Sequence, residues 1–137
     1  MIERIKLDLV TPNLPKDNEA IDLSRMEEAA RDMGFAAIER TLMVFGPGGW
    51  GGNHMHERRE AMFATNGDLT FVYRNEAGDR VEESMGRDAD GLVPVYFIPS
   101  WEPHLVKNYS GEPATLFELR DRISANYANL EGPESLR

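Results

Sequence analysis

The chain has 137 residues, the length of one domain, and folding at this size buries roughly two thirds of the unfolded surface. Apolar residues make up 41% and charged residues 28%, which is typical of globular proteins and excludes disorder of the whole chain. The 15 Lys and Arg against 24 Asp and Glu give a formal net charge of −9. Nucleic acids and anionic membrane surfaces are negative too, so we expect neither as a partner.

The sequence contains no cysteine, which excludes disulfides, thiolate nucleophiles and metal sites that need sulfur. Any metal site would therefore use imidazole and oxygen ligands. No apolar run approaches the roughly 18 residues of a membrane span, and the first residues do not form the apolar stretch of a signal peptide. We therefore expect a cytoplasmic protein.

The N-terminal part, residues 1–34, contains one expected strand and one expected helix. In residues 1–10 apolar and charged side chains alternate with a period near two, which predicts a strand. The helix is predicted from Ser24, where Ser24 and Glu27 match a capping box, to Gly34. Its apolar residues form a single stripe, so we expect a short helix at the periphery.

From residue 35 onward the pattern changes to short β-like segments separated by turn residues. The segments are residues 36–45, 60–65, 68–74, 80–85, 93–98, 104–109 and 114–120. They predict a small all-β barrel or sandwich with a core at about residues 36–120 and a C-terminal tail at residues 121–137. No linker or repeat interrupts the chain, so we expect one domain over residues 1–137.

A glycine-rich segment at residues 46–51 formally matches the dinucleotide-binding pattern G-x-G-x-x-G. In that pattern a helix follows the glycines, whereas here the next residues are Asn-His-Met-His and then β-like segments. We therefore expect a flexible loop at the mouth of the barrel rather than a dinucleotide site.

The chain has three histidines, His54, His56 and His104. On a strand, His54 and His56 would project to the same face within roughly 7 Å of each other, which is a chelating arrangement. Glu60 has the same parity, but a straight strand would carry it roughly 13 Å beyond His56, so the chain must bend at residues 57–59. An adjacent strand would bring His104 to the same point.

A turn signal, Asn66-Gly67, follows the segment that contains Glu60. It predicts a two-residue hairpin in which Glu60 pairs with Tyr73 across the ladder. Glu60 would then share its face with apolar side chains. A carboxylate there has a large desolvation cost unless a cation or strong hydrogen-bond donors compensate it.

Two stretches of the chain resemble the two motifs of the cupin superfamily, and the resemblance covers about residues 36–120. In the first motif, G-x5-H-x-H-x3-4-E-x6-G, the matching residues are Gly48, His54, His56, Glu60 and Gly67. In the second, P-x-G-x2-H-x3-N, they are Pro99, His104 and Asn108. Trp101 stands where the second motif has glycine.

The resemblance implies a double-stranded β-helix, or jelly-roll barrel, with a divalent metal ion inside. The implied ligands are His54, His56, Glu60 and His104. Nitrogen and oxygen ligands suit Fe, Mn, Ni, Cu or Zn and do not choose among them. The alternative is that hydrogen bonds satisfy the histidines and no metal binds.

Other residues are candidates for contacts with a ligand. Tyr73 would place its hydroxyl near a substrate or orient Glu60, or else belong to the core with its hydroxyl at the rim. Arg40 shares parity with apolar residues of its strand and would bind a carboxylate or phosphate, unless a bulge turns it outward. Trp50 and Trp101 would form an aromatic lid or a dimer contact.

The leading interpretation is an enzyme that uses its metal on a small organic substrate, with dioxygenase-like or isomerase and lyase-type chemistry. A second interpretation is a cupin of the sugar-nucleotide ketoisomerase or epimerase type, which uses histidine as acid or base without metal. A third is a non-catalytic module that binds a small molecule. By resemblance we also expect a homodimer that exchanges the N-terminal strand, residues 2–10.

Overall fold

The computed structural model describes residues 1–11, 20–121 and 126–137. Its strands and its one α-helix follow in chain order as β1 (Glu3–Leu7), β2 (Val10–Thr11), β3 (Ala20–Ile21), α1 (Leu23–Asp32), β4 (Glu39–Phe45), β5 (Trp50–His56), β6 (Glu60–Asn66), β7 (Leu69–Arg74), β8 (Arg80–Ser84), β9 (Val93–Ile98), β10 (His104–Asn108), β11 (Ala114–Arg120) and β12 (Tyr127–Asn129). A 3₁₀ turn, η2 (Gly132–Glu134), follows β12.

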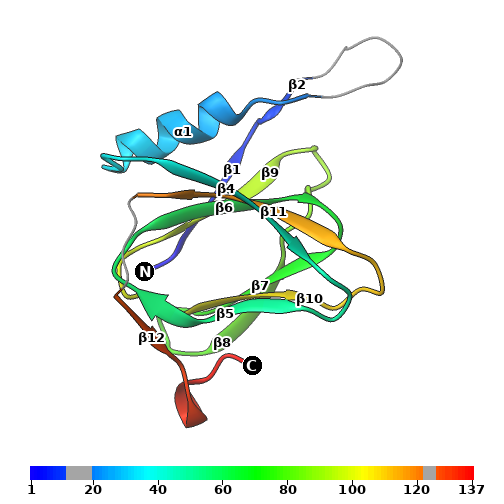
Figure 1. Cartoon of the computed structure of the whole chain (residues 1–137). Helices are drawn as coiled ribbons and strands as arrows, with labels where there is room; N and C mark the ends of the chain where they lie inside the picture. Colours follow the sequence, from blue (N-terminus) through cyan, green and yellow to red (C-terminus); the bar gives the residue numbers. More distant parts are fainter. Residues whose placement is uncertain (12–19, 122–125) are drawn as a thin grey trace.

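Ten of the strands form two antiparallel sheets that face each other (Figure 1). The first sheet has the order β1-β9-β6-β11-β4 and the second the order β12-β5-β10-β7-β8, while β2 and β3 form a separate ribbon. Successive strands such as β5, β6 and β7 alternate between the two sheets, which is the connectivity of a jelly roll. The prediction of an all-β barrel with one short helix is confirmed.

The space between the sheets is filled by the inward-facing side chains of both. This inner core consists of Ile2, Phe45, Met62, Leu69, Phe71, Met85, Tyr96, Ile98, Val106, Ala114 and Leu116. A second cluster lies on the outer face of the first sheet, where α1 covers it (Figure 1). Because β6 is buried on both faces, Met62 enters the inner core and its neighbour Phe63 packs in the cluster beneath α1.

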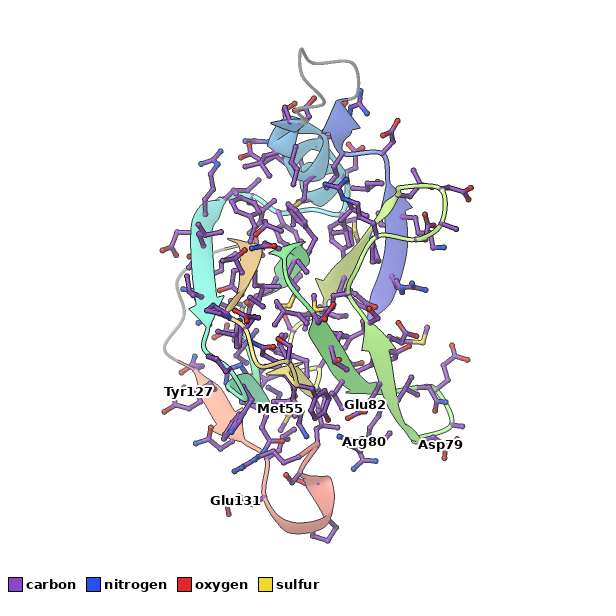
Figure 2. All side chains as sticks on the ribbon, turned by 90° about the vertical axis from the view of Figure 1, so that its right-hand side faces the viewer. Met55, Asp79, Arg80, Glu82, Tyr127 and Glu131 are labelled. Atoms are coloured by element: carbon purple, nitrogen blue, oxygen red, sulfur yellow. The ribbon has the colours of Figure 1, made fainter. Side chains whose placement is uncertain are left out.

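The C-terminal residues pack on the outer face of the second sheet. Leu130 and Leu136 are buried there with Val72 and Leu105, and Met55 packs against them. Figure 2 shows Met55 at the same end of the molecule as the C-terminal segment. The expected tail at residues 121–137 therefore contains a strand and anchored apolar residues, while its residues 122–125 lie outside the described part.

The start of α1 differs from the prediction. Asp22 is the N-cap, and its carboxylate accepts a hydrogen bond of 3.0 Å from the backbone N–H of Ser24. Ser24 already lies inside the helix and donates its hydroxyl to Asp22, so the predicted capping box of Ser24 and Glu27 is wrong. Aspartate caps as well as serine does, and the sequence offers both within three residues. Among the described residues no helix is both long and apolar enough to cross a membrane.

The predicted hairpin at Asn66-Gly67 is also wrong. β6 pairs with β9 on one side and β11 on the other, so it has no free edge for β7. β7 lies in the other sheet between β10 and β8. Gly67, at φ +85°, instead turns the chain from one sheet to the other, and a Cβ there would lie 2.6 Å from that of Ala114. The close approach to β11 explains the need for glycine.

Candidate metal centre

Four side chains from three strands converge inside the barrel, between the two sheets. The group consists of His54 and His56 on β5, Glu60 at the start of β6 and His104 at the start of β10. One potential ligand atom from each lies within 4.8 Å of all the others. An ion with bonds of about 2.0–2.2 Å has ligand atoms up to about 4.4 Å apart, so small adjustments would bring all four into contact with one ion.

A β-bulge in β5 brings the histidines together. His104 pairs with His54, but the next residue, Leu105, pairs with Gly52, which leaves Asn53 as an extra residue. Gly52 and Asn53 both have positive φ, at +96° and +58°. The glycine-rich segment, residues 46–51, was expected to be a flexible loop, whereas its last two residues, Trp50 and Gly51, are part of β5.

The chain bends between His56 and Glu60, as the predicted site required. β5 ends at His56, β6 begins at Glu60, and the two strands lie in different sheets. The backbone carbonyl of His56 accepts a hydrogen bond of 2.7 Å from the N–H of Trp101, which ties this bend to the turn before His104. The bend brings Nε2 of His56 into contact with Oε1 of Glu60.

Backbone carbonyls orient two of the imidazoles. Nδ1 of His56 lies 2.7 Å from the carbonyl oxygen of Arg58, and Nδ1 of His104 lies 2.9 Å from that of Glu102. A carbonyl only accepts hydrogen bonds, so Nδ1 carries the proton and Nε2 presents its lone pair to the centre. Metal-binding histidines in proteins usually have such a partner on the other ring nitrogen.

The electrostatics of the site favour the protonation states that bind metal. Burial lowers the pKa of His104 to about 4, and burial followed by the nearby His56 lowers the pKa of His54. Both imidazoles are therefore neutral at pH 7. Burial opposes ionisation of Glu60, but its contacts with His56 and Glu118 outweigh burial and lower the pKa of Glu60.

Glu118 also belongs to this site, although the sequence did not predict it. It lies on β11 opposite Met62, is buried, and accepts hydrogen bonds of 2.9 and 2.5 Å from Nε and Nη2 of Arg120. Burial, followed by the hydrogen bond to Glu60, raises the pKa of Glu118 to about 8. Its inward parity with the buried Leu116 was the available signal.

A small cavity of about 70 Å³ adjoins the four residues. The apolar residues that line it, here called the apolar wall, are Met43, Phe45, Met62, Val106 and Leu116. The cavity is also lined by the charged side chains of Arg58, Glu60, Glu118 and Arg120, beside His54 and His104. The arrangement joins a potential metal centre to a compartment with room for a few water-sized groups.

Two further predicted site residues lie elsewhere. Arg40 was expected on the core face of β4, but it is exposed on the outer face and paired with Glu27 of α1, so that expectation is wrong. Met43 and Phe45, of the opposite parity, line the cavity. Tyr73 pairs with His104 rather than Glu60, and its hydroxyl donates a hydrogen bond of 2.9 Å to Glu83. A catalytic role for Tyr73 stays a prediction.

The second motif forms the turn and strand that position His104. Trp101 replaces the motif glycine and has φ +61°, the left-handed conformation that glycine adopts readily. Asn108 donates hydrogen bonds to the carbonyls of Phe45, Gly46 and Glu112 and thus joins three segments. Trp50 is half-exposed at the start of β5, where the guanidinium of Arg137 lies 4.2 Å from its ring.

Comparison with models of protein families gives no match, and neither does comparison with curated proteins. Several solved structures share the fold. The capsular polysaccharide assembling protein CapF from Staphylococcus aureus superposes with a TM-score of 0.56 and 20% identity, over 69% of this chain and 27% of that one. The polyketide cyclase RemF from Streptomyces resistomycificus gives 0.54 and 20%, over 72% and 64%.

An oxalate oxidase in complex with the substrate analogue glycolate gives a TM-score of 0.55 and 14% identity, over 93% of this chain and 54% of that one. The present chain thus matches less than two thirds of the length of each of these proteins. All three have the cupin fold. The chain therefore has the double-stranded β-helix fold that these three proteins share, and this is the fold that its two motifs predicted.

Proposed function

We propose that the protein is a metal-dependent enzyme that binds one divalent ion and acts on a small organic molecule. The ligands would be His54, His56, Glu60 and His104. The observation that carries the proposal is the convergence of one donor atom from each within 4.8 Å, beside a cavity of about 70 Å³.

The donor set itself fits a metal. Three neutral imidazoles and one carboxylate suit Fe, Mn, Ni, Cu or Zn. Nε2 of His56 is buried and faces Glu60, with its other ring nitrogen bound to a carbonyl. A buried cluster of this kind is costly to maintain unless a cation or hydrogen bonds compensate the carboxylate.

The residues around the site would orient the ligand side chains and exclude water. A bound ion would act as a Lewis acid or as a centre for redox chemistry. The carbonyls of Arg58 and Glu102 hold the imidazoles of His56 and His104 in one tautomer. The opposite pKa shifts of the two neighbouring carboxyl groups, lowered for Glu60 and raised for Glu118, favour one net negative charge on the buried pair.

The other two interpretations receive less support. A cavity of about 70 Å³ is much smaller than the several hundred Å³ of typical pockets for organic ligands, which disfavours a sugar nucleotide. The oxalate oxidase structure was determined with glycolate, a molecule of a size closer to this cavity. A homodimer and a cytoplasmic location remain predictions.

Metal content tests the proposal. The protein is purified without a histidine tag and without chelator, and elemental analysis is made beside His104→Ala and the control Tyr109→Phe, whose side chain is exposed. We expect close to one transition-metal ion per chain in the wild type and the control, and loss of the ion in His104→Ala. A folded wild-type protein that neither contains nor takes up such ions would contradict the proposal.

A further inference from the structure

Two arginines line the cavity beside the proposed ligands. Arg58 lies between β5 and β6, with Nε 3.6 Å from Oε1 of Glu60. Arg120 ends β11 and lies opposite Glu60 in the ladder. The side chains of Arg58 and Arg120 are 19% and 26% exposed, whereas those of Glu60 and Glu118 are 3% and 4% exposed. The guanidinium groups therefore lie between the buried carboxyl groups and solvent.

The charge of the cavity differs in sign from that of the whole protein. Three neutral imidazoles and the carboxylate of Glu60 leave a divalent ion with a formal charge of +1. Arg58 and Arg120 add two positive charges, and Glu118 removes at most one. The loaded cavity is therefore positive, while the chain has a formal charge of −9. Positive charges inside a cavity with low-dielectric walls attract an anion more strongly than the same charges would in bulk water.

The volume and the lining of the cavity fit a small anion that has an apolar part. Its volume of about 70 Å³ admits a few water-sized groups. Met43, Phe45 and Val106 are part of the apolar wall of the same cavity. A carboxylate with a short hydrocarbon chain fits this lining. Its charged group would bind the guanidinium groups through paired hydrogen bonds, and its chain would contact the apolar wall.

We propose that the substrate of this site is a small carboxylate, whose charged group is bound by Arg58 and Arg120 next to the metal ion. This inference rests on the proposed function, because the ion supplies part of the positive charge. The two arginines would orient the carboxylate at the mouth of the cavity and leave the rest of the molecule facing the ion and the apolar wall.

The competing explanation is that the arginines only neutralise Glu60 and Glu118. Arg120 does bind Glu118 through Nε and Nη2. If neutralisation were their whole role, removal of one guanidinium would lower stability or metal affinity but would not change the preference for a charged over an uncharged ligand. The preference for an acid over its amide is therefore the decisive readout.

The experiment uses the full chain loaded with Co(II), whose visible absorption reports changes around the ion. Propionate and its uncharged isostere propionamide are titrated into the wild type, Arg58→Gln and Arg120→Gln. Arg31→Gln is the matched control, because Arg31 is exposed on α1 and paired there with Glu27. Thermal melting and Co(II) content are measured for every variant.

We expect the wild type and Arg31→Gln to bind propionate at least about ten-fold more tightly than propionamide. Each cavity variant should lose about ten-fold in propionate affinity, with Co(II) content and propionamide binding unchanged. If Arg120→Gln does not fold, the test rests on Arg58→Gln alone, because Arg58 lies in the bend between β5 and β6 rather than in a strand. Unchanged propionate affinity in the folded, Co(II)-loaded cavity variants would overturn the inference and leave the proposed function standing. A folded wild type that takes up neither Co(II) nor Fe, Mn, Ni, Cu or Zn would overturn both.

Discussion

His104 lies directly opposite His54 in the ladder between β10 and β5, and the register slips by one residue immediately beyond this pair. Their ring centroids are 5.0 Å apart, and that of His56 lies 5.0 Å from His54 and 4.8 Å from His104. The bulge at Gly52 and Asn53 thus sits at the point where the three imidazoles meet. The backbone of β5 is as important for the site as its side chains.

The first prediction concerns Glu60 and its neighbour Glu118. Glu60→Gln keeps the shape of the side chain but removes the negative charge, so we expect metal affinity to fall at least about ten-fold. Glu118→Gln is the matched control, a buried carboxyl group next to Glu60 but outside the ligand group. It should retain one ion per chain and lose less affinity. Competition with a chromophoric chelator measures both, and equal affinities of Glu60→Gln and wild type would remove Glu60 from the ligands.

The second prediction concerns Gly52. A Cβ at this residue would lie 2.9 Å from the carbonyl oxygen of His104, and φ is +96°. Gly52→Ala should therefore cost more stability than left-handed strain alone, which is about 1–3 kcal/mol, and should also weaken metal binding. Gly78→Ala is the control, since Gly78 has φ +85° and a methyl group there would meet nothing within 4 Å.

Urea unfolding and metal titration compare the two alanine variants. We expect Gly52→Ala to be less stable than Gly78→Ala. Metal affinity should fall in Gly52→Ala and stay unchanged in Gly78→Ala. If the two variants lost equal stability and both bound metal normally, the close approach to His104 would not matter for the site.

The third prediction concerns Asn53, which joins the bulge to the C-terminal segment. Its Oδ1 accepts a hydrogen bond of 2.8 Å from the N–H of Leu136, and its Nδ2 donates to the carbonyl of Leu130 and the hydroxyl of Ser135. Asn53→Gly keeps the positive φ accessible but removes these bonds, so we expect a loss of about 1–3 kcal/mol in unfolding free energy. Hydrogen exchange should show faster exchange at the Leu136 amide. Unchanged exchange there would mean that Asn53 does not anchor the segment.

The fourth prediction concerns Trp101, at φ +61° and 45% exposed. Trp101→Gly and Trp101→Ala lose the same indole contacts, but only glycine relieves the left-handed strain. We expect the glycine variant to be more stable than the alanine variant by about 1 kcal/mol, measured by thermal melting. The reverse order would mean that the turn before His104 is not strained by a side chain.

The sequence motifs predicted that His54, His56, Glu60 and His104 come together, because these residues lie at fixed spacings on short segments. The spacing of His54, His56 and Glu60 required a bend, and the structure has that bend where β5 passes into β6. Asn108, which matches the second motif, joins neighbouring segments through its side chain. Local spacing and turn chemistry carried this information.

The predictions that failed depend on which strands pair with each other, and local sequence patterns do not reveal this pairing. Leu42 and Val44 suggested that Arg40 faces the core, but their side chains are 63% and 68% exposed. The pattern was ambiguous because both faces of β4 carry apolar residues. The Asn66-Gly67 signal is typical of hairpins, yet β6 already has two neighbours. Glu118 was missed for the same reason, since only the pairing of β11 with β6 brings it to Glu60.

The most direct test of the central claim is X-ray absorption spectroscopy of the metal-loaded protein. We predict one ion surrounded by three imidazole nitrogens and at least one oxygen, with bonds of about 2.0–2.2 Å. In His104→Ala the imidazole contribution should fall or the ion should be lost. A spectrum with fewer than three imidazoles in the wild type, or one unchanged by His104→Ala, would contradict the proposed centre.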